Sequence, residues 1–217
     1  MNGICSIEFL EKKGKFYYPG EETMGDDVKE KCGISRQEAF DLMRQYLPHD
    51  NLQKHCLATE VIMRALARKF GNDEDIWGIA GLLHDLDYSE TKDHMDRHGL
   101  VTEKILKEKG VNDEIIHAIK SHNADNLGFE RTEVFEHALT AAECITGMVV
   151  ATTLVYPDKK LASVKPKSIT KRMKQKEFAR SVNRDYIREC ETIGIPLNEF
   201  AELSLAAMRE ISDDLGL

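Results

Sequence analysis

An imidazole and a carboxylate stand side by side at the end of an apolar run near the middle of the chain. In the segment GIAGLLHDLDYSE, residues 78–90, no charge precedes His84, which is followed by Asp85 and, two positions later, by Asp87. Burying such groups in a helical core costs several kcal/mol unless each finds a partner. The segment therefore predicts a buried polar cluster that includes residues from elsewhere in the chain.

Three further polar residues fall on or beside apolar helix faces. His55 lies next to the apolar face of a helix expected over 51–70, His122 continues the apolar stripe of the helix after Asn112, and Glu143 lies within ALTAAECITGMVVA. A single histidine on such a face is usually an ordinary core residue. One explanation covers all of these side chains: they gather round a divalent metal ion, whose charge offsets the cost of burying them.

The spacing of the pair is compatible with metal binding. Neighbours on a helix point about 100° apart. At a helix end, His84 can reach past its backbone while the shorter Asp85 approaches from the side, so both can contact one ion. Asp85 also has two carboxylate oxygens, which is enough to bridge two ions.

Helical patterns carry all of these residues. Ser35 and Glu38 form a capping box that opens a helix ending at Pro48. Further helices are expected over about 51–70 (ended by Gly71), 74–86, 99–110, from Asn112 to His122, over about 132–155, and after Asn183 and Asn198. Apart from the N-terminal part, nothing reads as a sheet, so the sequence predicts an all-α, multi-helix fold.

The first residues of the chain differ from the rest. The stretch SIEFLEKKGKFYY alternates loosely around a KKGK turn, which is typical of a short β-hairpin. Pro19, Gly20 and Gly25 then indicate a linker. We therefore expect an N-terminal appendage over residues 1–33 and one helical domain over 34–217.

Charge is distributed unevenly. The chain carries a net charge of −8, so binding to nucleic acid is not expected. The segment Pro157–Arg180 nevertheless has nine Lys or Arg residues and two acidic ones, a net charge of +7, which leaves −15 for the remainder. This segment is either a solvated helix face or an electropositive rim that attracts an anionic substrate.

Composition also argues against several classes of protein. No run of about 18 apolar residues is present, so no membrane span is expected. The N-terminus lacks the apolar run of a signal peptide. The five cysteines are scattered without CxxC spacing, which argues against a disulfide framework or a zinc knuckle. We expect a reduced, cytoplasmic protein with no membrane partner.

The pattern H…HD…D, spread over helices, is the signature of the HD superfamily of metal-dependent phosphohydrolases. This sequence resembles the small, stand-alone bacterial members called HDIG-type, through KHCLATEVIMRALARKFG, WGIAGLLHDLDY and HGLVTEKILKEKGV. The resemblance runs from about Ile34 to the C-terminus and is weaker after Pro157, which implies an HD domain over 34–217. It also implies a first metal ion bound by His55, His84, Asp85 and Glu143.

Some HD proteins hold a second ion with two more histidines. The matching positions here are His98 and His122, with Asp85 as the bridge, and both one-ion and two-ion sites remain open. Two departures matter: the last ligand is generally Asp rather than the longer Glu143, and HDLD replaces HDIG. The GYP motif that accompanies cyclic dinucleotide hydrolysis is absent, so that substrate is not expected.

The resemblance implies hydrolysis of a phosphate ester or nucleotide by metal-activated water. Asp85, Asp87 and Lys120 are the catalytic candidates: Asp87 could orient the water or the leaving group, and Lys120 could contact a phosphate oxygen. The cofactor would be one or two divalent ions (Fe, Mn, Mg, Ni, Co or Zn), and the partner a small phosphorylated substrate, with oligomerisation left open. The alternatives are a mixed-valent di-iron oxygenase with the HD fold and a metal-binding module with little turnover.

Overall fold

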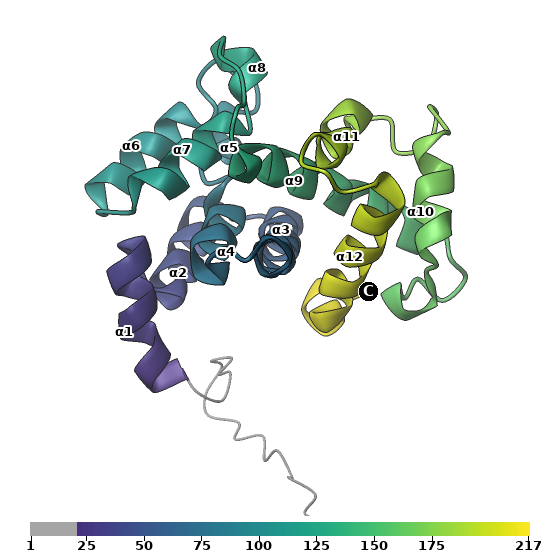
Figure 1. Ribbon diagram of the computed structural model, residues 1–217, viewed down its shortest axis with the longest axis horizontal. Coiled ribbons are helices and arrows are strands. Elements are labelled where there is room, and N and C mark those ends of the chain that lie inside the picture. The colour runs from purple at the N-terminus through teal and green to yellow at the C-terminus, as the bar shows by residue number, and fades with distance from the viewer. Residues whose placement is uncertain (1–20) are drawn as a thin grey trace, which may run out of the picture.

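Helices make up all the regular structure that the computed structural model describes, residues 21–217 (Figure 1). The longer ones are α1 (Glu21–Cys32), α2 (Arg36–Tyr46), α3 (Asp50–Phe70), α4 (Glu74–Leu83), α6 (Leu100–Glu108), α7 (Asp113–Ser121), α9 (Val134–Leu154), α10 (Pro166–Met173), α11 (Arg184–Thr192) and α12 (Leu197–Glu210). Short turns of helix are α5 (Tyr88–Thr91), α8 (Ala124–Leu127), α13 (Ser212–Leu215) and the 3₁₀ turn η1 (Leu161–Ser163). The predicted all-α class is confirmed.

Helix α9 crosses the middle of the molecule, as Figure 1 shows. Helices α3, α7, α11 and α12 all pack against it, and α3 also packs closely on α4. Among the described residues, α9 is the one helix long and apolar enough to cross a membrane, but 67% of its most apolar window is buried inside the protein. That burial is expected of a central core helix.

The helix boundaries follow signals that the sequence contains. The Ser35 hydroxyl accepts the Glu38 N–H while the Glu38 carboxylate accepts the Ser35 N–H, which completes the predicted capping box before α2. Gly71 ends α3 in the left-handed conformation, at φ 71°. The Asn112 side chain accepts the Glu114 N–H and caps α7.

The N-terminal prediction is corrected in part. The expected hairpin falls in residues 1–20, which lie outside the described residues. The linker expected to follow it is wrong, because Glu21–Cys32 form helix α1. Val28 and Cys32 are buried in the core, and this packing offsets the cost of a glycine within the helix.

The basic segment includes η1 and α10. On α10, Ile169 and Met173 are buried while Lys167 and Lys171 are exposed, so its lysines occupy the solvent side of an amphipathic helix. This arrangement fits the solvated-face interpretation of the segment. The alternative, an electropositive rim for an anionic substrate, stays a prediction.

Candidate metal centre

The six predicted ligands come from separate parts of the fold. His55 lies on α3, His84 directly follows α4, His122 directly follows α7, and Glu143 lies on α9; Asp85 and His98 come from the irregular chain around α5. The structure brings all six together in two groups. The outer group is His55, His84 and Glu143, and the inner group is Asp85, His98 and His122; in each, the possible ligand atoms lie within 4.8 Å of one another.

Asp85 belongs to the inner group but also faces the outer one, and each of its oxygens is directed to a different pair of histidines. Asp85 Oδ2 is 3.7 Å from His55 Nε2 and 3.6 Å from His84 Nε2. Asp85 Oδ1 is 3.4 Å from His98 Nε2 and 3.8 Å from His122 Nε2. This is the arrangement required of a carboxylate that bridges two ions, each also bound by imidazoles.

The outer imidazoles turn their Nε2 atoms toward each other, 3.1 Å apart. His84 Nδ1 lies 2.9 Å from the carbonyl oxygen of Gly81, so its proton is on Nδ1 and its Nε2 carries a lone pair. His55 Nδ1 donates to the Thr146 hydroxyl at 2.8 Å, because that hydroxyl itself donates to the Glu143 carbonyl at 2.6 Å. Two Nε2 lone pairs therefore face each other, a repulsive contact that a cation between them would relieve.

The inner imidazoles are also turned inward. His122 Nδ1 contacts the carbonyl oxygen of Ile119, and His98 Nδ1 contacts Asp87 Oδ1 at 2.7 Å. The two Nε2 atoms lie 2.8 Å apart, close enough to share one proton or to bind one ion in its place. Imidazole nitrogens with carboxylate oxygens suit Fe, Mn, Co, Ni or Zn, so the donor set fits the implied divalent metal.

Burial and neighbouring charge set the protonation of these groups. Burial lowers the pKa of His55 to about 4 and that of His122 to about 3, so both rings are neutral at neutral pH. Burial alone would raise the pKa of Asp85, but the imidazoles around it, His84 foremost, hold that pKa well below its usual range. Neutral imidazoles at His55 and His122 beside an ionised Asp85 are the protonation state that metal binding needs.

Two other side chains of the centre, His98 and Glu143, are held protonated. Burial lowers the pKa of His98, but its hydrogen bonds to Asp85 and Asp87 outweigh this and raise it to about 9. Burial raises the pKa of Glu143 to about 8, although the Cys144 thiol donates to its Oε1 at 2.8 Å. Binding of a cation by His98 or by Glu143 would therefore displace a proton from that side chain.

The candidate ligands differ in their access to solvent. The His55 side chain is 24% exposed, whereas those of His84, His98 and His122 are 1%, 3% and 6% exposed. Glu143 is also partly exposed. Solvent therefore reaches the candidate centre beside His55 and Glu143, whereas His84, His98 and His122 are shielded from it.

Asp87 does not have the predicted access to water or to a leaving group. Its carboxylate is buried, with Oδ1 bonded to His98 and Oδ2 accepting the N–H groups of Gly99 and Thr102, both at 2.9 Å. Lys120 lies outside both groups, and its Nζ is 3.4 Å from Glu103 Oε2. Its contact with a phosphate oxygen stays a prediction.

The remaining histidines that the structure describes contribute to neither group. His117 pairs with Glu136 at 2.7 Å and His137 with Glu189 at 2.9 Å. Sequence reasoning missed Thr146, which orients His55. The available signal was its position one helical turn after Glu143, on the face of α9 that meets α3.

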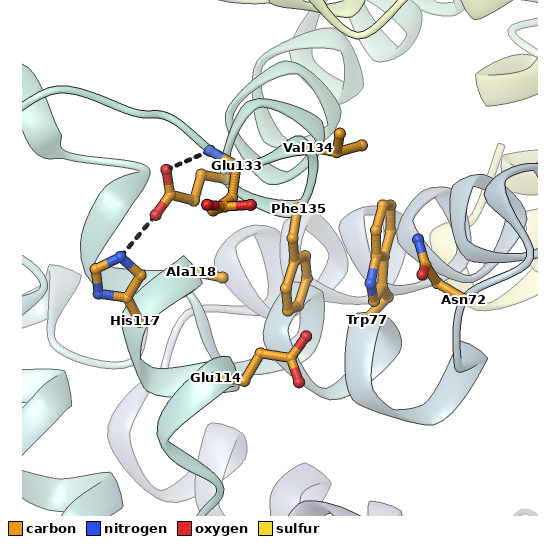
Figure 2. Close-up of a pocket in the computed structure, with 9 residues that line it drawn as sticks. Asn72, Trp77, Glu114, His117, Ala118, Glu133, Val134 and Phe135 are labelled. Atoms are coloured by element: carbon orange, nitrogen blue, oxygen red, sulfur yellow. Dashed lines mark hydrogen bonds and ion pairs between the residues drawn. The ribbon is translucent and has the colours of Figure 1, made fainter.

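A surface pocket of about 340 Å³ lies apart from the centre and contains none of the six predicted ligands (Figure 2). In it, Trp77 and Phe135 are stacked, with ring centroids 4.9 Å apart. The His117 ring points to the Glu136 carboxylate, which also accepts the Glu133 N–H. The pocket therefore marks the junction of α4, α7 and α9.

Comparison with known proteins gives one family. The family model named HD domain matches residues 52–151, a range that includes all six candidate ligands. No solved structure matches the chain. Together with the helical fold and the H…HD signature at His55, His84 and Asp85, this match supports membership of the HD superfamily.

Proposed function

We propose that this protein is a metal-dependent phosphohydrolase that acts on a phosphate ester or a nucleotide. The observation that carries the proposal is the position of Asp85, which presents one oxygen to the imidazoles of the outer group and the other to those of the inner group. The match to the HD-domain family model supports the reaction class.

In this proposal the six candidate ligands bind the metal, and Lys120 contacts the substrate. Asp85 with the outer group would hold one divalent ion, and Asp85 with His98 and His122 a second. When bound, such ions lower the pKa of a water molecule and neutralise charge on a phosphoryl oxygen. We place the phosphate beside the partly exposed His55 and Glu143, and Lys120 is the cation proposed to meet one of its oxygens.

The proposal includes a cytoplasmic location and a reduced state. The described cysteines, Cys32, Cys56, Cys144 and Cys190, are all free thiols. Three of the four are buried in a core that no disulfide crosses within the described residues. These thiols support a reducing compartment.

The test combines metal content with turnover. Anomalous scattering should give the identity and number of bound ions, and phosphate release should be assayed on esters and nucleotides with Mn²⁺, Mg²⁺, Ni²⁺ or Co²⁺ added. We expect His84→Ala and Asp85→Ala to lose metal and to lower kcat/KM by more than about 100-fold, because each removes a ligand rather than a neighbour of one. His117→Ala, which changes an exposed histidine outside both groups, should leave both measurements unchanged.

Three outcomes would contradict the proposal. Turnover that survives the loss of His84 or Asp85 would exclude a reaction at this centre. A filled metal site with no phosphate released from any ester or nucleotide would indicate a binding module. Two iron ions with substrate-dependent oxygen uptake would indicate the oxygenase instead.

A further inference from the structure

The inner group depends on one side chain that is not itself a candidate ligand. His55 lies on a long helix, and His84 and His122 each continue a helix by one residue. His98 is different: it ends the turns between α5 and α6, so no helix of its own fixes the direction of its ring. Its position must come from contacts made after the chain has folded back.

Asp87 makes the contact that orients the His98 ring. Its Oδ1 accepts the Nδ1 proton of His98 at 2.7 Å, and the Thr91 hydroxyl lies 3.3 Å from the same oxygen. With Nδ1 fixed in this way, Nε2 is directed toward His122 and Asp85. A carboxylate behind a ligand histidine fixes the ring orientation and tautomer and makes the imidazole a stronger donor.

The second oxygen of Asp87 holds the start of α6. Oδ2 accepts the N–H groups of Gly99 and Thr102, each at 2.9 Å. Gly99, at φ 86°, provides no side-chain cap for α6, so the buried Asp87 carboxylate acts as a remote cap for that helix. The residue after His98 is thus held by the same carboxylate that holds its ring.

No comparable carboxylate lies behind the outer histidines. His84 Nδ1 donates to a carbonyl of its own helix, and His55 Nδ1 donates to Thr146. Neither contact involves Asp87. A change confined to Asp87 therefore reaches His98 directly and the outer group only through the shared Asp85.

We propose that Asp87 is a positioning residue that controls occupancy of the inner group alone, so that the centre holds two ions with it and one without it. The inference rests on the proposed metal centre. The two ions would then depend on different parts of the fold. The outer ion depends on α3, α4 and α9, and the inner ion depends on the Asp87 carboxylate, which is bonded both to His98 and to the first turn of α6.

The experiment is a metal titration of the full chain followed by calorimetry, with Mn²⁺ or Co²⁺ as the probe. Wild type should bind two ions. Asp87→Asn should retain the first and bind the second about 10- to 100-fold more weakly, the usual cost of removing a carboxylate behind a ligand histidine. Asp93→Asn and Asp96→Asn make the same chemical change at exposed positions between α5 and α6, and should bind both ions as wild type does.

A milder variant covers the case in which Asp87→Asn does not fold. Thr91→Val removes a hydroxyl that contacts both Asp87 and His98, and should weaken only the second ion. Equal weakening of both ions in these variants, or unchanged binding of both, would overturn the inference. A wild-type chain that binds no ion would refute the proposed metal centre itself, which makes the two failures distinguishable.

Discussion

At the scale of single residues, the sequence was sufficient to find the candidate ligands but not what supports them. His84 and Asp85 stand out because charged or polar groups interrupt an apolar run, and His55, His122 and Glu143 because they sit on buried helix faces. Asp87 was predicted to orient the water or the leaving group, and its hydrogen bonds to residues 98 to 102 were not foreseen, because they form only through the folded path of the chain. The spacing of residues within one helix cannot predict such contacts.

A second buried carboxylate gives a pH-dependent prediction. Glu136 is 2% exposed; its Oε2 accepts the N–H groups of Thr132 and Glu133, and its Oε1 accepts the Ser121 hydroxyl. Burial opposes ionisation, but the hydrogen bonds outweigh it and hold the pKa of Glu136 below 4.5. Its contribution to the free energy of unfolding is therefore complete above about pH 4.5 and is lost as the pH falls through the lower, folded-state pKa.

We expect Glu136→Gln to lower the free energy of unfolding at pH 7 by about 1.5–3 kcal/mol, the range for hydrogen bonds to a charged group. The difference from wild type should shrink as the solution is acidified below pH 4.5. Chemical denaturation at several pH values measures this. Glu130→Gln, at an exposed position nearby, should show no such difference, and a constant difference across pH would contradict the argument.

At the scale of helices, the sequence predicted the helix ends that are set by local caps, but it did not predict a helix whose stability depends on packing against the rest of the protein. The Ser35–Glu38 box, Gly71 and Asn112 mark helix ends through local hydrogen bonds and backbone conformation, so the sequence contains the whole signal. Helix α1 was missed because its stability depends on Val28 and Cys32 packing against other helices. Pro19 and Gly25 favoured a linker in the local sequence pattern.

The close approach of α3 and α4 is set by Gly81, which gives a prediction at this scale. A Cβ atom at Gly81 would lie 3.0 Å from the backbone of Thr59 and Glu60, atoms that cannot move without shifting α3. We expect Gly81→Ala to lower the free energy of unfolding by about 1–3 kcal/mol in urea denaturation. Because the Gly81 carbonyl also orients His84, the variant should bind metal more weakly.

Gly71→Ala is the comparison for this variant. An alanine there would meet no atom within 4 Å, but it would have to adopt φ 71°. Its cost should be about 1 kcal/mol from the backbone alone, with metal affinity unchanged. Unaltered metal affinity in Gly81→Ala would show that the α3–α4 distance does not set the position of His84.

At the scale of the whole molecule, the candidate centre joins parts of the chain from residue 55 to residue 143. An ion bound there would bind only the folded protein, because the six ligands are spread over residues 55 to 143 and meet only in the folded chain. Metal at about 100 times its dissociation constant should then add about 2.7 kcal/mol to the free energy of unfolding. For a chain of this size that corresponds to a rise in Tm of roughly 5–10 °C.

Thermal denaturation with chelator and with excess Mn²⁺ measures this effect. His84→Ala should show little or no shift between the two conditions. An equal shift in wild type and His84→Ala would place the stabilising ion elsewhere in the protein. Fold class could be predicted at this scale because helical periodicity continues through most of the chain. The grouping of the ligands into an outer and an inner set could not, because it depends on how distant helices pack together.

The single tryptophan of the chain stands where α4 meets α9. Trp77 is 3% exposed and lies parallel to Phe135, at an interplanar angle of 6°. Helix α4 leads from Trp77 to His84, and α9 leads from Phe135 to Glu143 about two turns later. Indole fluorescence is therefore an intrinsic, label-free reporter of whether these two helices have docked, and so of the moment in refolding at which His84 and Glu143 are brought together.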